Sequence, residues 1–150
     1  MQCSDELINA LESLLKLMCN GVEVNEALKL ILANVKDEQC RIVISNTVDK
    51  GLRGEVNELS GSSLNNYLLY LKPKVSDELK GILPIILNMI NDGKIIEALS
   101  YLMGNVCSLP DYDKAYVIDL ARLMVLAKHD KGIIDSIKCR INLILNVLRT

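Results

Sequence analysis

Apolar residues recur every three or four positions along most of the chain, which is the spacing of one face of an α-helix. Leu7, Leu11 and Leu14 form the first such face. Ser4 stands before it as a candidate N-cap, and Gly21 follows where a helix would end. The first segment of the chain is therefore predicted to be an amphipathic helix.

The same spacing, with its start and stop residues, predicts helices along the rest of the chain. The further predicted segments are 23–35, 37–52, 64–71, 76–93, 94–106, 111–129 and 132–148. The stretch RIVIS at 41–45 is rich in β-branched residues and could be a short strand, but its helical neighbours favour a helix. Pro84 lies inside one predicted helix, where we expect a kink or a restart near Gly81.

Two stretches of the chain begin alike, 72 positions apart. SDELINALESLLKLMCNG at 4–21 and SDELKGILPIILNMINDG at 76–93 share seven of 18 residues. Two more anchors recur in the same order: Glu-Ala-Leu with Asn-Val in the second helix, and Asp-Lys-Gly before Leu or Ile. Helix-start and helix-stop preferences explain part of this likeness, but they do not require the later anchors. A duplication explains all three.

We therefore predict an all-α protein, a single compact helical bundle of about seven to eight helices in one domain, 1–150. The bundle is predicted to consist of two tandem four-helix repeats, 1–75 and 76–150, related by a pseudo-twofold axis.

Composition narrows the range of functions. The net charge is −2, so the chain has no strong basic field that would attract nucleic acid. Aromatic residues make up 3% of the chain and are all Tyr, so few aromatic side chains are present on which bases could stack. No apolar run reaches the roughly 20 residues of a membrane span, and no signal peptide is evident. We expect a soluble, cytoplasmic protein whose five scattered cysteines are reduced and buried, with no metal, cofactor, catalytic residue or small-molecule substrate.

The remaining prediction is a non-enzymatic subunit that binds other protein, its own copy included, by burying aliphatic helix faces. The last helix is apolar on two sides, which indicates either a core position or an interface. Acidic residues are in excess in residues 1–38 and basic residues in residues 122–150. These opposite charges would set the orientation in which two partners bind. The predicted interface residues are Leu64, Tyr67, Leu68, Leu71, Leu143 and Val147.

An alternative is a small subunit of a nucleoprotein complex. In size and helical content the chain is similar to the small subunits of RNA-guided defence complexes. Basic residues that mostly lie toward the C-terminus would then contact phosphates. These are Lys50, Arg53, Lys128, Lys131, Lys138, Arg140 and Arg149.

A third alternative rests on the eight residues from Arg122 to His129. This R-x6-H spacing resembles the motif of the HEPN ribonucleases, which are helical bundles, although Leu123 stands where that family usually has a polar residue. The resemblance implies that Arg122 would stabilise phosphate charge and that His129 would act as acid or base.

Overall fold

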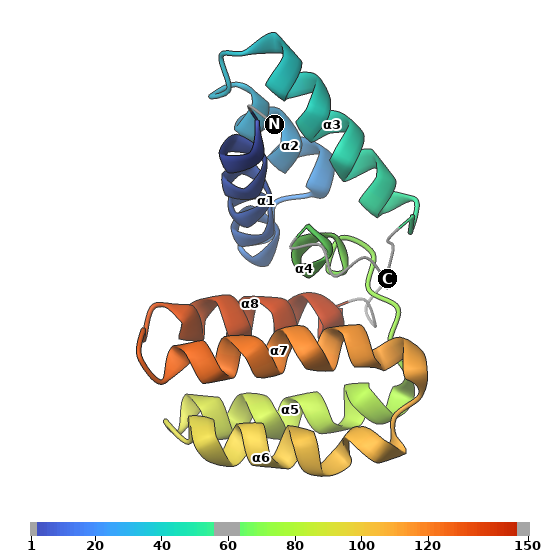
Figure 1. Cartoon of the computed structure of the whole chain (residues 1–150), viewed down its shortest axis with the longest axis vertical. Helices are drawn as coiled ribbons and strands as arrows, with labels where there is room; N and C mark the ends of the chain where they lie inside the picture. Colours follow the sequence, from blue (N-terminus) through green and yellow to red (C-terminus); the bar gives the residue numbers. More distant parts are fainter. Residues whose placement is uncertain (1–2, 56–63, 147–150) are drawn as a thin grey trace. The chain divides into compact units, whose positions relative to one another are not determined.

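The computed structural model describes residues 3–55 and 64–146, and in these residues it contains helices and no strand (Figure 1). The predicted all-helical class is confirmed. The eight α-helices described are α1 Ser4–Cys19, α2 Val24–Leu32, α3 Glu38–Leu52, α4 Asn65–Leu68, α5 Asp77–Asn91, α6 Ile95–Asn105, α7 Lys114–Ala127 and α8 Ile133–Asn146. Short 3-10 turns at Val106–Ser108 and Asp111–Asp113 connect α6 to α7.

The chain divides into two compact units, Met1–Lys72 and Pro73–Thr150. This division lies close to the boundary predicted between the repeats. In the first unit α1 packs against α2, α3 and α4, and α3 also packs against α4. In the second unit each of α5 to α8 packs against the next and α8 packs back against α5, so that four antiparallel helices form a closed bundle (Figure 1).

Local signals for helix ends are largely confirmed. The Ser76 hydroxyl accepts a hydrogen bond from the backbone N–H of Leu79 at 3.1 Å and caps α5. Gly21 and Gly93 end α1 and α5 with φ of 92° and 79°, a left-handed conformation that costs glycine little. Ser4, in contrast, is the first helical residue, and Cys3 occupies the cap position without a capping side-chain bond.

Helices α3 and α5 are both continuous over the segments where a strand or a restart was considered. RIVIS lies within α3, so the helical prediction is correct. The predicted restart near Gly81 is wrong, because α5 continues from Asp77 through Pro84 to Asn91. Pro84 is exposed.

Beyond the first two helices of each unit, the two predicted repeats differ in structure. Asp49–Leu52, the third anchor of the first repeat, lies in the last turn of α3. Its predicted counterpart, residues 130–133, forms the turn between α7 and α8 and the first residue of α8. The fourth helix also differs, since α4 has four residues and α8 has 14. The pseudo-twofold axis stays a prediction.

Candidate interaction surfaces

Helices α6 and α7 of the second unit form an apolar groove of about 610 Å³ on the outside of the bundle. Most of its lining is aliphatic and comes from both helices. We call these residues the outer seam: Leu99, Met103 and Val106 on the α6 side, and Ile118, Ala121 and Val125 on α7.

The outer seam is far more exposed than an aliphatic core. Ile118 is 68% exposed, Val125 48% and Met103 47%. The seam residues follow one another at alternating spacings of three and four, which is the pattern of a helix face that packs against another helix. The opposite face of α7 already fills the core with residues that include Leu120, Met124 and Ala127. Helix α7 is therefore apolar on two sides, and only one of them is covered within the second unit.

Two cations flank the outer seam, and each has an acidic partner nearby on the chain. Lys114 Nζ lies 3.0 Å from Asp111 Oδ1, and Arg122 Nη2 lies 2.7 Å from Asp119 Oδ1. Asp119 also accepts from Arg140, so one carboxylate serves two cations there. The rest of the groove lining is aliphatic, which suits it to an apolar protein surface.

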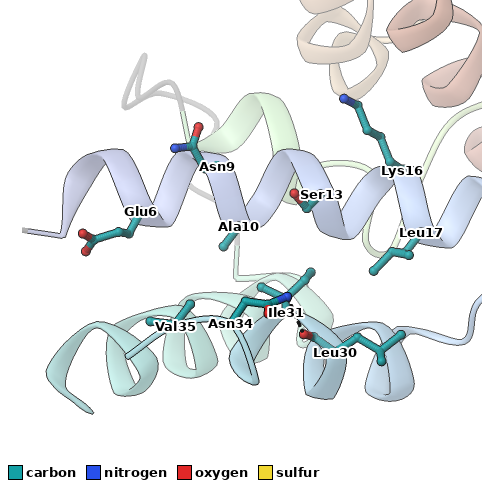
Figure 2. Close-up of a pocket in the computed structure, with 10 residues that line it drawn as sticks. All are labelled: Glu6, Asn9, Ala10, Ser13, Lys16, Leu17, Leu30, Ile31, Asn34 and Val35. Carbon is teal, nitrogen blue, oxygen red and sulfur yellow. Dashed lines mark hydrogen bonds between the residues drawn. The ribbon is translucent and has the colours of Figure 1, made fainter. Parts of the chain in front are cut away.

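A second groove, of about 520 Å³, lies between α1 and α2 in the first unit (Figure 2). Ala10 and Leu17 point from α1 toward α2, and Ile31 lies opposite them, while Lys16 points away from α2 (Figure 2). The rim is polar, with Glu6, Asn9, Ser13 and Asn34 among its residues. This groove is amphipathic and has fewer exposed aliphatic side chains than the outer seam.

The structure buries three of the five predicted interface residues that it describes. Leu68, Leu71 and Leu143 are buried, and Leu64 and Tyr67 are half-buried. Leu68 and Leu71 lie against Gly51 of α3, where a Cβ would come within 3.0 Å of Leu68 Cδ2 and 2.7 Å of Leu71 Cδ1. Val147 lies outside the described residues. In the folded chain this set therefore leaves less aliphatic surface free than the outer seam does.

The residues that were predicted to bind phosphates differ in exposure, and not all of them lie on the surface. Arg140 is buried and its Nε donates to Asp119 Oδ2 at 3.2 Å. Lys50, Lys128 and Lys131 are exposed, and Lys138 is half-buried. Arg149 lies outside the described residues.

Arg53 ends α3 and pairs with two carboxylates. It bonds Asp49, and its Nη2 lies 2.8 Å from Glu55 Oε2. The hydrogen bond to Glu55 raises the pKa of Arg53 and lowers the pKa of Glu55. All three side chains are exposed, so solvent weakens these pairs.

The two residues of the R-x6-H spacing lie in different elements, one on a helix and the other in the turn after it. Arg122 is on α7 and donates to Asp119, and His129 is exposed in the turn that follows α7. They are about two helical turns apart in sequence.

Sequence reasoning missed the ion cluster of Asp119, Arg140 and Arg122, in which the first two side chains are buried and Arg122 is 43% exposed. A signal for it was present, because Asp119 lies between Tyr116 and Leu123 on the apolar face of its helix, and Arg140 lies between Ile137 and Ile144. A charge at such a position predicts a buried partner.

The chain matches no protein-family model, no curated protein and no solved structure. Within residues 3–55 and 64–146, no helix combines the length and the apolar character needed to cross a membrane.

Proposed function

We propose that this protein is a helical assembly subunit that works by binding rather than by catalysis, and that a second copy of the chain covers the outer seam. The observation that carries the proposal is the row of exposed aliphatic side chains that ends in Ile118 and Val125, on a helix whose other face is already in the core. Exposed apolar surface of this kind typically marks a protein interface.

The length and charge of the outer seam favour a second copy as the occupant. From Lys114 to Val125 the groove follows α7 for about 16 Å, or three turns of helix. In a symmetric dimer the same patch faces itself, so a patch of one charge would repel its copy. Lys114 and Arg122 each have a carboxylate partner, which reduces this repulsion.

Packing the α6 and α7 pairs of two copies against each other would give an interface of four helices. Burial of one Ile or Val side chain contributes about 1.5–3 kcal/mol. Several such side chains can together outweigh the loss of translational and rotational freedom on association.

The experiment is sedimentation equilibrium of the full chain and of single variants. Ile118→Glu and Val125→Glu should each weaken the dimer about 100-fold or more, because an unpaired carboxylate would be buried in an apolar interface. Ile85→Glu on α5 is the matched control, since Ile85 is an exposed aliphatic residue outside the groove. A wild-type chain that is monomeric at high concentration, or a dimer that tolerates Ile118→Glu, would refute the proposal.

We also propose that the hairpins α1–α2 and α5–α6 are copies of one ancestral unit. Three structural details support this. Ala27 and Ala98, the fourth residues of α2 and α6, both have 0% exposure. The side-chain nitrogens of Asn34 and Asn105 each donate to the carbonyl four residues earlier, at 3.5 and 2.7 Å.

The third detail is the way in which α1 and α5 end. After α1, Gly21 N–H donates to the Met18 carbonyl and Val22 N–H to the Leu17 carbonyl. After α5, residues 93 and 94 repeat both bonds with residues 90 and 89. Half of the outer seam then comes from α7, which lies beyond the copied hairpin in the second unit.

A further inference from the structure

The first unit brings together three side chains that are typical metal ligands. Cys3 precedes α1, Glu6 lies in the first turn of α1, and Cys40 lies in the first turn of α3. One ligand atom from each lies within 4.8 Å of the other two. The two sulfur-bearing residues are buried and the carboxylate is exposed.

Cys3 and Cys40 form a disulfide, with their Cα atoms 5.5 Å apart. The expectation of five reduced, buried cysteines is therefore wrong for this pair. It is also wrong for Cys19 and Cys139, which are disulfide-bonded and half-buried, and for Cys107, which is free but exposed. The two partners are 37 residues apart in the sequence, so no short Cys motif marks them.

Glu6 lies against this sulfur pair, since its Oε2 is 2.8 Å from Cys40 Sγ. A disulfide sulfur carries no proton and cannot donate to the carboxylate. In the dithiol form the Cys40 S–H could donate to Glu6, and in the dithiolate form both sulfurs and the carboxylate oxygen could bind a cation instead. The carboxylate is thus better matched to the reduced pair than to the oxidised one.

We propose that the reduced Cys3 and Cys40 thiolates and the Glu6 carboxylate bind a thiophilic divalent cation of the Zn²⁺ class, and that formation of the disulfide expels it. Thiolate and carboxylate are both common zinc ligands, and tetrahedral zinc with three protein ligands keeps one position for water.

The three ligands together carry three negative charges, which is one more than the two positive charges of the cation. The N-termini of α1 and α3 both point their positive dipole ends toward this cluster, because Cys3 and Cys40 lie at the starts of these helices. Helix N-termini also stabilise thiolates, which are the form that binds metal. The fold therefore offsets the excess negative charge.

Release of the cation requires an oxidant, for which a low-molecular-weight disulfide suffices. One thiolate attacks that disulfide, forms a mixed disulfide and displaces the first small thiolate. The second thiolate then attacks the mixed disulfide at its Cys sulfur, which forms the Cys3–Cys40 bond and displaces the second small thiolate. Two electrons pass from the protein to the small disulfide, and the cation leaves without a change of its own oxidation state.

The test is titration of the reduced full chain with Co²⁺, followed by competition with Zn²⁺. We expect one cobalt per chain with a thiolate-to-cobalt absorption band, displaced by zinc. The oxidised chain should lack this band. Cys3→Ser, Cys40→Ser and Glu6→Gln should each lower the affinity more than about tenfold.

Asp5→Asn is the matched control for Glu6→Gln, because Asp5 is also exposed in the first turn of α1 but lies outside the cluster. Cys107→Ser, Cys19→Ser and Cys139→Ser should keep the band. Glu6→Gln removes no cysteine, so it tests the site even where Cys3→Ser impairs folding. Absence of a cobalt band in the reduced chain, a band that survives Cys40→Ser, or an affinity unchanged by Glu6→Gln would each overturn the proposal. None of these outcomes depends on the proposed dimer.

Discussion

Asp119 is, like Asp113, a carboxylate of the second unit that is almost completely removed from water. Only 1% of its surface is exposed, against 2% for Arg140. Its two oxygens accept from Arg122 Nη2 at 2.7 Å and from Arg140 Nε at 3.2 Å. Burial of such ions is costly, so the pairing mainly offsets a desolvation penalty and fixes how α7 and α8 align.

Loss of the Asp119 charge should therefore be expensive. Asp119→Asn leaves Arg140 buried without an anion, and we expect it to lower the free energy of unfolding by about 3 kcal/mol or more. Urea unfolding followed by circular dichroism measures the change. Asp111→Asn, which removes the exposed pair with Lys114, should cost less than about 1 kcal/mol. Equal effects of the two variants would contradict the account of this cluster.

At the residue scale, the sequence predicted the buried apolar residues well and the buried polar residues poorly. Leu7, Leu11 and Leu14 are in the core as expected, because helical spacing alone assigns their face. The partners of Asp119 and the Cys3–Cys40 bond were missed. Both depend on which helices pack together, and no local pattern encodes that.

At the scale of the element, helix ends were predicted well where the signal is local, as at Ser76 and Gly93. The segment 64–71 was predicted as one helix, but only Asn65–Leu68 is α-helical. Residues 68–71 are four consecutive buried residues, and a single helix face cannot bury four in a row. After Leu68 the chain continues as a turn in which Leu69, Tyr70 and Leu71 are buried.

Glycines inside helices give a prediction at this scale. Gly81 of α5 is exposed and a Cβ there would meet nothing within 4 Å, so Gly81→Ala should raise the free energy of unfolding by about 0.5–1 kcal/mol. Gly51→Ala should gain less or lose stability, because its methyl group would crowd Leu71 Cδ1 at 2.7 Å. Thermal unfolding of both variants provides the comparison. A greater gain from Gly51→Ala would show that α4 does not pack against α3 as described.

At the scale of the whole molecule, the all-helical class predicted from the sequence is confirmed. The duplication stays a prediction, and the chain divides into two compact units between Lys72 and Pro73. The outer seam was not singled out. Its spacing is visible in Ile118, Ala121 and Val125, but α7 has a second apolar face. Only the closed packing of α5 to α8 decides which face is covered.

Burial of the outer seam by a second copy is the central claim, and methyl NMR spectra of the full chain over a dilution series test it most directly. The account predicts that the methyl signals of Met103, Ile118 and Val125 shift as the dimer dissociates, while those of Ile42 and Ile85, which are exposed elsewhere, stay in place. Unchanged seam signals across a dilution in which sedimentation shows dissociation would place the interface on another surface and contradict the account.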